Sequence, residues 1–213
     1  MNKKPVLLAT NNQGKLKELA ELLKNFNLEV VGLKDFPHFE EVEENGATFE
    51  ENALLKAKAA CEHSGLYSIA DDSGLCVDAL NGAPGIYSAR YAFMHNTLPP
   101  STGMTGSIDR DKLNIEKLLA ELQGVSKSGR QARFYCAIVA CSPDGRSIAS
   151  HGTWEGNVAF EPKGRNGFGY DPVFICNQSQ KHAAELTARE KNARSHRSQA
   201  LKNLLKLWPD FWR

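Results

Sequence analysis

Apolar and polar positions in the first third of the chain alternate between two periods. Residues 6–10 form a short apolar run that predicts a buried strand, and the polar segment NNQGK follows it. Apolar residues then recur at helical spacing over residues 16–23. Thr48 opens a capping-box pattern, and the apolar face after it continues until Gly65. The pattern therefore predicts a strand, a loop and a helix, and then a second helix that leads into a strand at residues 66–70.

The middle of the chain predicts a loop, a helix and a hairpin. Residues 92–107 carry prolines and glycines among small polar residues, so we expect an exposed loop there. An amphipathic stretch over residues 113–122 predicts a helix. Residues 132–141 are rich in strand-forming residues, and a PDG turn lets residues 147–153 return antiparallel to them.

The last part of the chain completes an α/β pattern. The sequence VFI after Pro172 indicates another strand, Thr187 repeats the capping-box spacing, and a helical apolar stripe runs to Trp208. Strand and helix units followed by a hairpin predict an α/β fold with a mixed β-sheet covered by helices on both faces. A chain of 213 residues can form one large domain or one domain with two lobes.

Composition and charge limit the classes of function. Lys and Arg number 26 against 25 acidic residues, so the chain lacks the overall positive field of a protein that grips nucleic acid or an anionic membrane. No apolar run reaches the length of a membrane span or of a signal-peptide core. The five cysteines are an odd number without a C-x-x-C pair, which fits reduced thiols. We expect a cytoplasmic protein with no nucleic-acid or membrane partner.

Two adjacent carboxylates, Asp71 and Asp72, follow directly after the strand expected at residues 66–70. Like charges near a core are costly unless cations or donors compensate them. The sequence DDSG is typical of a turn, because Asp and Ser accept backbone hydrogen bonds and Gly74 tolerates a positive φ. The alternative is a metal site, because Mg²⁺ binds carboxylate oxygens and completes its shell with water and phosphate. A cation of this kind would then compensate the charge.

Residues 10–15, TNNQGK, stand at the junction between the first strand and the first helix. Backbone amides and the helix macrodipole favour a phosphate at such a place, and Lys15 would add a full charge. The segment lacks the Walker A pattern. A helix-entry turn with a solvated lysine is the alternative.

Three further segments concentrate chemically useful residues. EEVEENG at residues 40–46 could direct one carboxylate to the same cation, or it is a solvated acidic face. GFGYDP at residues 167–172 could stack a nucleobase, or it is a bulge with an aromatic plug. EKNARSHRSQ at residues 190–199 could bind an anion or a keto oxygen, or it is a solvated basic helix face.

Taken together, these segments resemble the inosine triphosphate pyrophosphatase family, also called the Ham1 or RdgB-like family. Five segments in order carry the resemblance: TNNQGK at 10–15, ENGATFEENALLKA at 44–57, ADDSGLCVDALNGAPGIYSARYA at 70–92, FGYDPVF at 168–174 and SHRSQAL at 195–201. They span nearly the whole chain, and five in order are highly specific. Residues 94–108 differ in content and length from the acidic connection usual in the family.

The resemblance implies an elongated mixed β-sheet flanked by helices, with two lobes around a central substrate cleft, in a single domain over residues 1–213. It implies a Mg²⁺-dependent hydrolase that converts the purine nucleoside triphosphates ITP, dITP and XTP to the monophosphate and pyrophosphate. Such an enzyme keeps these nucleotides out of DNA and RNA. The resemblance also implies a homodimer.

Carried over by position, the resemblance gives each segment a role. The substrate-binding residues are Thr10, Asn11, Asn12, Gln13, Gly14 and Lys15 for the triphosphate, Ser73 beside it, Phe168, Gly169, Tyr170 and Asp171 for the base, and Lys191, His196 and Arg197 as donors that read the base. The metal-associated carboxylates are Glu44 and Asp72. Asp72 is also the catalytic proton acceptor. On this view, magnesium and its bound triphosphate balance the charges of Asp71 and Asp72.

Other functions remain as alternatives. Ser73 could be a nucleophile, but no G-x-S-x-G elbow surrounds it, and we reject that role. A Maf-like nucleotide pyrophosphatase could share the phosphate loop, although FGYDP and SHR disfavour it. A regulatory nucleotide-binding or RNA-binding module could use the basic C-terminal segment without catalysis, but it would not need the two aspartates.

Overall fold

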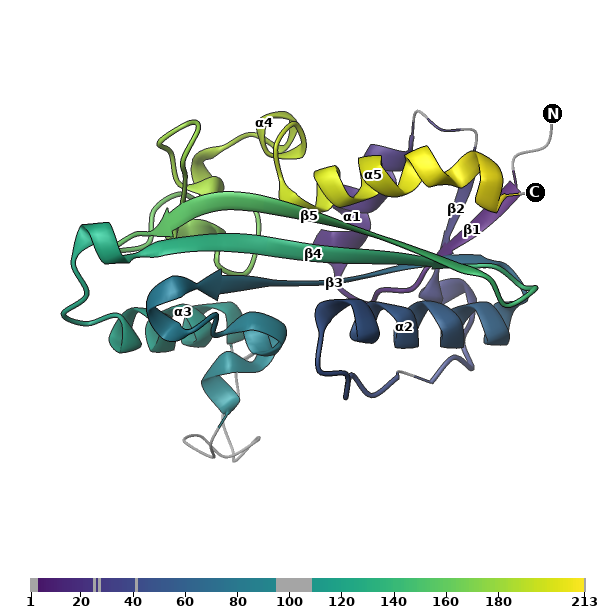
Figure 1. Cartoon of the computed structure of the whole chain (residues 1–213), viewed down its shortest axis with the longest axis horizontal. Helices are drawn as coiled ribbons and strands as arrows, with labels where there is room; N and C mark the ends of the chain where they lie inside the picture. Colours follow the sequence, from purple (N-terminus) through teal and green to yellow (C-terminus); the bar gives the residue numbers. More distant parts are fainter. Residues whose placement is uncertain (1–3, 25, 27, 41, 95–108, 213) are drawn as a thin grey trace. The chain divides into compact units, whose positions relative to one another are not determined.

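The computed structural model describes residues 4–24, 26, 28–40, 42–94 and 109–212 of the 213-residue chain. Within these ranges the strands form one six-stranded sheet in the order β2-β1-β3-β4-β5-β6 (Figure 1). They are β1 (Lys4–Leu8), β2 (Leu28–Gly32), β3 (Tyr67–Val77), β4 (Gln131–Cys141), β5 (Ser147–Val158) and β6 (Phe174–Cys176). β1 pairs parallel with β2 and β3, and β5 pairs antiparallel with β6. The predicted mixed sheet is confirmed.

The α-helices of the described ranges follow the predicted pattern closely in the first half of the chain. They are α1 (Gln13–Leu23), α2 (Phe49–Ser64), α3 (Arg110–Glu121), α4 (Ala188–Asn192) and α5 (His196–Phe211). Thr48 caps α2 by accepting the Glu51 N–H at 3.1 Å, and Gly65 ends the helix with a φ of 68°. None of the helices in the part of the chain that the structure describes is long and apolar enough to cross a membrane.

The chain divides into two compact units, of which the first comprises residues 1–73, 135–153 and 192–213. In this unit α2 covers one face of the sheet, and α1 and α5 cover the other (Figure 1). Alternation along β1 explains both layers, because Val6 and Leu8 pack toward α1 and α5, whereas Leu7 packs toward α2. Each fully buried leucine of this kind contributes about 1.5–3 kcal/mol.

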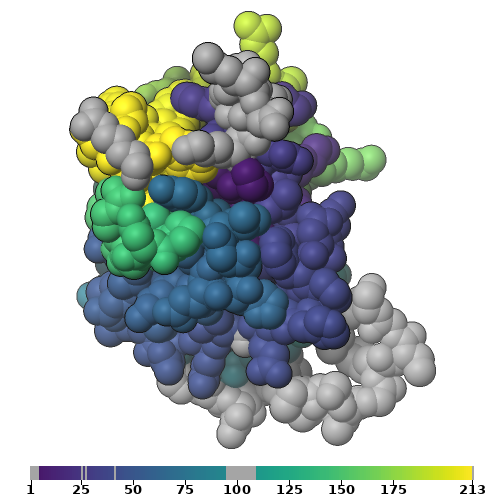
Figure 2. Space-filling model, turned by 90° about the vertical axis from the view of Figure 1, so that its right-hand side faces the viewer, coloured from purple at the N-terminus to yellow at the C-terminus, as the bar shows by residue number. Residues whose placement is uncertain are grey.

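The hairpin of β4 and β5 closes at a turn over residues 142–146. Ser142 donates its N–H to the carbonyl oxygen of Arg146 at 3.0 Å, and Gly145 supplies the positive φ of 89° that the turn requires. The Arg146 guanidinium lies 5.6 Å from the centre of the Phe211 ring, so the turn lies beside the end of α5 (Figure 2). The predicted hairpin is confirmed.

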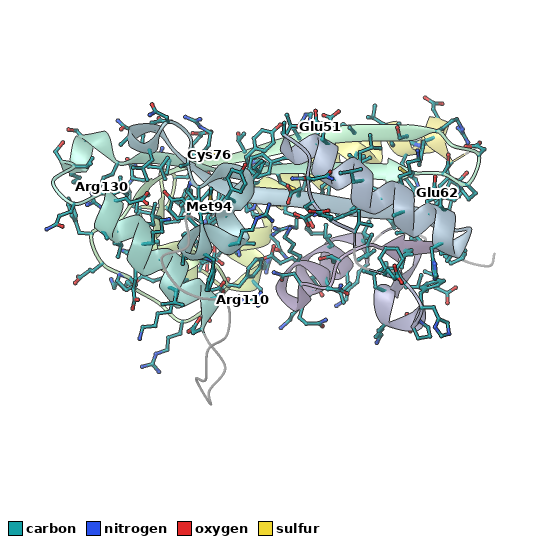
Figure 3. All side chains as sticks on the ribbon, turned by 90° about the horizontal axis from the view of Figure 1, so that it is seen from below. Glu51, Glu62, Cys76, Met94, Arg110 and Arg130 are labelled. Carbon is teal, nitrogen blue, oxygen red and sulfur yellow. The ribbon has the colours of Figure 1, made fainter. Side chains whose placement is uncertain are left out.

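The second unit comprises residues 74–134 and 154–191. Its core packs Leu118 and Leu122 of the α3 segment against Leu75, Trp154 and Phe174. Arg130, labelled in Figure 3, donates to the carbonyl oxygens of Leu122 at 2.8 Å, Val125 at 3.1 Å and Ala159 at 3.0 Å. These bonds fix the C-terminal end of α3 within its unit.

The structure corrects the prediction for the segment around the aspartates. β3 does not end at Ala70 but continues to Val77, so Asp71, Asp72 and Ser73 lie inside a strand. The interpretation of DDSG as a turn is therefore wrong. Pairing with the neighbouring strands outweighs the turn preference of these side chains. The local sequence does not reveal that pairing.

Three further differences concern the start of a helix, a strand that was not predicted and residues 167–172. The capping box of Thr187 and Glu190 begins the short helix α4, whereas α5 has its own N-cap at Ser195, which accepts the Ser198 N–H at 3.3 Å. The sequence pattern did not predict β2. Residues 167–172 lie outside the strands, so the bulge interpretation is also wrong. Most of the loop expected at residues 92–107 lies outside the described residues.

Candidate functional site

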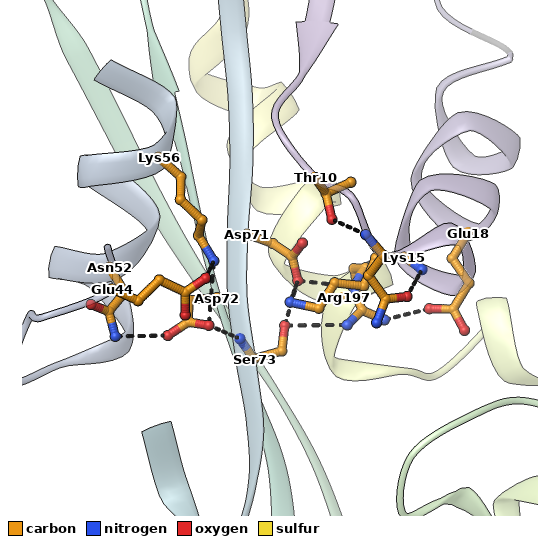
Figure 4. A network of polar contacts seen from close by, with 11 residues as sticks. Thr10, Lys15, Glu18, Glu44, Asn52, Lys56, Asp71, Asp72, Ser73 and Arg197 are labelled. Carbon is orange, nitrogen blue, oxygen red and sulfur yellow. Dashed lines mark hydrogen bonds and ion pairs between the residues drawn. The ribbon is translucent and has the colours of Figure 1, made fainter. Parts of the chain in front are cut away.

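The adjacent carboxylates of β3 lie on opposite faces of the strand. Successive side chains of a strand point to opposite faces, and in Figure 4 Asp71 points toward α1 and α5, whereas Asp72 points toward α2. The two charges are therefore separated, and each has its own set of partners within the first unit.

Asp71 is compensated by the protein itself. Its Oδ2 lies 3.1 Å from the Lys15 Nζ and 3.1 Å from the Arg197 Nε, and it accepts the Ser73 hydroxyl at 2.6 Å. Burial would raise the pKa of Asp71, but Lys15 and Arg197 outweigh it and hold that pKa well below its usual range. The expectation that magnesium and triphosphate balance both aspartates is therefore wrong for Asp71.

Arg197 is buried, with a side chain only 2% exposed. Its Nε contacts Asp71, its Nη1 pairs with Glu18 of α1, and its Nη2 donates to the Ser73 hydroxyl at 3.3 Å. Burial would lower the pKa of Arg197, but the carboxylates of Asp71 and Glu18 outweigh burial and raise it. The role predicted for Arg197, reading the base, stays a prediction. In this structure its guanidinium joins α1, β3 and α5.

The predicted phosphate loop lies at the N-terminus of α1. Asn12 is the N-cap, and its side chain accepts the Lys15 N–H at 3.0 Å. The Asn12 N–H in turn donates to the Thr10 hydroxyl at 3.2 Å. The first-turn amides of a helix point out of its N-terminus, where the macrodipole favours an anion. The position of the loop and of Lys15 at this helix end is compatible with a phosphate, and their role in binding one stays a prediction.

Asp72 is 5% exposed and faces α2. The Asn52 Nδ2 donates to its Oδ2 at 3.2 Å, the Ser73 N–H donates to its Oδ1 at 3.1 Å, and the Lys56 Nζ lies 3.5 Å from the same Oδ1. Burial raises the pKa of Asp72, and Lys56 only partly opposes that effect. The neighbours in β3 thus have carboxyl pKa values shifted in opposite directions.

The ammonium of Lys56 bridges Asp72 and Glu44. Its Nζ lies 2.9 Å from the Glu44 Oε1. Burial alone would lower the pKa of Lys56, but Asp72, Asp71 and Glu44 outweigh burial and raise it. The structure thus places a positive charge between the two carboxylates that the resemblance assigns to a metal.

The donor chemistry of Glu44 and Asp72 fits magnesium. Mg²⁺ is usually bound through one or two carboxylates and completes its shell with water and substrate phosphates. Over the described ranges, no group of three or more His, Cys, Asp and Glu side chains is placed to hold a metal ion. Two carboxylates that already share one cation therefore suit a magnesium ion that arrives with a phosphate ligand.

Asn52 and Lys56 were not among the residues predicted from the sequence. Both lie on α2 with i, i+4 spacing, which places them on one helix face, and that spacing is the signal that could have found them. Asn52 is fully buried, and its Oδ1 accepts the Gly46 N–H at 2.8 Å. Because the Oδ1 is used in this way, the Nδ2 is left to face Asp72. Asn52 therefore connects the loop after Glu44 with Asp72, the predicted proton acceptor.

The predicted base-binding residues of the second unit form a compact group. The Asp171 Oδ2 accepts the Lys191 Nζ at 2.6 Å and the Phe168 N–H at 2.9 Å. The Lys191 Nζ lies 4.8 Å from the centre of the Phe168 ring. Tyr170 is buried in the core, and its hydroxyl donates to the Ser88 carbonyl at 2.9 Å. Its side chain therefore anchors residues 168–171 in the core of the second unit.

The predicted site residues belong to both units. Phe168, Gly169, Tyr170, Asp171 and Lys191 lie in the second, and the others lie in the first. Within the first unit, the structure brings Lys15, Ser73 and Arg197 together around Asp71. His196 is buried at the start of α5.

The fold and this site define an α/β protein in which one strand presents carboxylates on both faces, each met by a lysine. On the Asp71 face lies a helix N-terminus suited to phosphate, and on the Asp72 face lies a pair of carboxylates suited to a divalent cation. The sequence model described as the Ham1 family matches residues 6–207, and the chain belongs to this family.

Relatives match the chain over nearly its full length. A protein from Nitratidesulfovibrio vulgaris named dITP/XTP pyrophosphatase is 54% identical over 213 residues, which cover 100% of each chain. A protein of the same name from Bacillus cereus is 48% identical and covers 99% of this chain and 98% of its own length. The solved structure of a HAM1 protein from Coxiella burnetii has a TM-score of 0.80 and 40% identity, covering 97% of this chain and 99% of that chain.

Proposed function

We propose that the chain is a nucleoside triphosphate pyrophosphatase that hydrolyses dITP, XTP and ITP to the nucleoside monophosphate and pyrophosphate. The names of relatives that are 54% and 48% identical over nearly the whole chain support this activity. The single structural observation that carries the proposal is the ammonium of Lys56 between Glu44 and Asp72, at 2.9 Å and 3.5 Å. An acidic pair that binds one cation, with Asp72 buried and Glu44 partly exposed, is suited to hydrolysis of a phosphoric anhydride.

The triphosphate binds at the N-terminus of α1. Loop amides and the hydroxyl of Thr10 hold phosphate oxygens, and Lys15 supplies a positive charge beside them. The ion pair with Asp71, at 3.1 Å, holds the ammonium of Lys15 in a fixed position, and its side chain is 15% exposed. As pyrophosphate leaves, Lys15 and the amides stabilise the charge that develops on it.

Asp72 is the proton acceptor. Its pKa is raised by burial, and a base whose pKa moves toward the working pH accepts protons more effectively. Asp72 takes a proton from the water that attacks the α-phosphorus. Glu44 and Asp72 would hold Mg²⁺, which when bound polarises phosphate oxygens and lowers the pKa of a bound water.

The purine lies against the ring of Phe168, with Asp171 and Lys191 beside it. Hypoxanthine and xanthine carry a 6-keto acceptor where adenine carries a 6-amino donor, so a cationic donor such as Lys191 would meet adenine unfavourably. Sites that hydrogen-bond one substrate and leave a polar group unpaired with another discriminate by about 10⁴ to 10⁵. We expect ATP to be a poor substrate by a comparable factor.

We further propose that the enzyme works in the cytoplasm as a homodimer and removes these nucleotides before a polymerase uses them. The near-balanced charge of the chain, 26 basic against 25 acidic residues, is consistent with a small-molecule substrate in place of a nucleic-acid partner.

The decisive experiment is a substrate panel with purified protein. ITP, dITP, XTP, GTP and ATP are each supplied with and without Mg²⁺, and both products are identified. We expect monophosphate and pyrophosphate from the first three, and only with a divalent cation. Release of orthophosphate in place of pyrophosphate, or equal rates for ITP and ATP, would overturn the proposal.

A further inference from the structure

Two carboxylates hold the segment of residues 167–171 in its observed conformation. The Asp171 Oδ2 accepts the Phe168 N–H at 2.9 Å from within the segment. The next amide along the chain, that of Gly169, donates to the Oδ2 of Asp111 at 2.7 Å. Asp111 lies 58 residues earlier in the sequence, in the first turn of α3, which begins at Arg110 (Figure 3).

The backbone of this segment depends on such contacts. Gly167 and Gly169 have φ values of 79° and 59°, in the left-handed region that glycine visits freely. Nothing lies within 4 Å of the position that a Cβ of Gly169 would occupy, so packing does not fix this residue. Its amide is instead fixed by a charge-assisted hydrogen bond, which is stronger than a neutral one.

The helix that carries Asp111 is itself firmly anchored in the second unit. Asn114 accepts the Ala92 N–H at 2.8 Å and donates to the Ala89 carbonyl at 3.3 Å. One turn further on, Leu118 is fully buried in the core. Asp111 therefore joins a rigid element to a segment that contains two left-handed glycines.

Asp111 is not the N-cap of α3. That role belongs to Asp109, whose Oδ1 accepts the Lys112 N–H at 3.1 Å. Because Asp109 already caps the helix, the Oδ2 of Asp111 is left to accept the Gly169 N–H. The Asp111 carboxylate also lies in the first turn, where it complements the positive end of the helix dipole. The two aspartates are both exposed and two residues apart, so each is a matched control for the other.

We propose that Asp111 is a positioning residue for base recognition. By accepting the Gly169 N–H it holds the turn that carries Phe168 and Asp171, the partner of Lys191 on α4. This inference rests on the proposed role of residues 168–171 in binding the base. Asp111 touches no substrate itself, so its loss should weaken binding of the nucleoside and leave triphosphate binding unchanged.

The test compares Asp111→Ala, Asp111→Asn and Asp109→Ala in steady-state hydrolysis of dITP. We expect Asp111→Ala to raise KM about tenfold, the lower end of what a charge-assisted hydrogen bond supports, because water competes at this exposed site. Asp111→Asn keeps an oxygen acceptor and should restore most of the affinity. Asp109→Ala should lower the melting temperature of the protein and leave KM unchanged.

Inorganic tripolyphosphate, which has no base, serves as the second probe. Its inhibition constant against dITP should be the same in Asp111→Ala and in the unaltered protein. An unchanged KM in Asp111→Ala, an equal rise in Asp109→Ala, or a parallel loss of tripolyphosphate inhibition would overturn the inference.

Amide hydrogen exchange separates this inference from the proposed activity. Asp111→Ala should speed exchange over residues 167–171, whereas Asp109→Ala should not. If the unaltered protein hydrolyses no purine triphosphate, the proposed function fails on its own evidence. If exchange over residues 167–171 is the same in Asp111→Ala as in the unaltered protein, the positioning contact itself is disproved, whatever the enzyme does.

Discussion

Asp71 and Asp72 are neighbours in β3, yet one carboxylate contacts Lys15 and Arg197 and the other contacts Lys56 and Asn52 on the opposite face. Burial acts on both, but the pKa of Asp71 is lowered and that of Asp72 is raised. The difference arises because Asp71 has two close cations, one of them a buried arginine. The same residue type therefore serves as a structural anion at one position and as a candidate base at the next.

Replacing Asp71 should destabilise the protein at neutral pH. Its depressed pKa means that its contribution to stability is present above the unfolded value of 3.8 and is lost as pH falls through the folded pKa. We expect Asp71→Asn to lower the free energy of unfolding at pH 7 by about 3–5 kcal/mol, because Arg197 is left buried with fewer counter-charges. Urea unfolding at several pH values measures this, and the loss should shrink in acid.

Replacing Asp72 should have the opposite effect on stability. A raised carboxyl pKa gives a contribution that is present below 3.8 and is lost as pH rises through the folded pKa. We expect Asp72→Asn, unfolded in urea with a chelator present, to be at least as stable as the unaltered protein at pH 7. An equal loss of stability in the two variants would contradict the division of roles between the faces of β3.

Replacing Asp72 should also remove most of the activity. Loss of a proton acceptor typically costs about 10²- to 10⁴-fold in rate, and loss of a metal-associated carboxylate adds to that. We expect Asp72→Asn to keep the circular dichroism spectrum of the unaltered protein and to lose dITP turnover by at least this factor. Substantial turnover in a folded Asp72→Asn would rule out Asp72 as the proton acceptor.

Asn52 should control the pH dependence of the reaction. Its Nδ2 donates to Asp72 and thereby lowers the pKa of that carboxyl. Because a base must be ionised to act, Asn52→Ala should move the acidic limb of kcat/KM to higher pH. Asn114→Ala, which also removes a buried asparagine, should lower stability and leave that limb in place. A limb that stays fixed in Asn52→Ala, or moves to lower pH, would disprove the contact.

The packing of α5 on β5 depends on Gly152. A Cβ there would lie 2.2 Å from the His196 carbonyl oxygen and 2.5 Å from the Ala200 nitrogen, so the backbone of the helix would have to move. We expect Gly152→Ala to lower the free energy of unfolding by about 1–3 kcal/mol. Gly32→Ala is the control, because the nearest atom to its Cβ is the Lys34 Cγ at 3.9 Å. Thermal or urea unfolding distinguishes them, and equal stability would show that α5 does not approach so closely.

Sequence by itself determined the local elements and the composition of the site. Capping by Thr48 and termination at Gly65 fixed the bounds of α2, because both signals act within one helical turn. The order of strand and helix units followed by a hairpin predicted a mixed sheet with helices on both faces. The five segments identified the candidate residues, because each segment carries its functional side chains within a few consecutive positions.

Only the tertiary structure decided which of those residues meet. Asp71 and Arg197 are 126 residues apart in sequence, and Asp111 and Gly169 are 58 apart, so no local pattern pairs them. DDSG looked like a turn until pairing with neighbouring strands extended β3 through it. That extension put the two aspartates on opposite faces, because side-chain direction in a strand follows from backbone pairing and not from the identity of the residues.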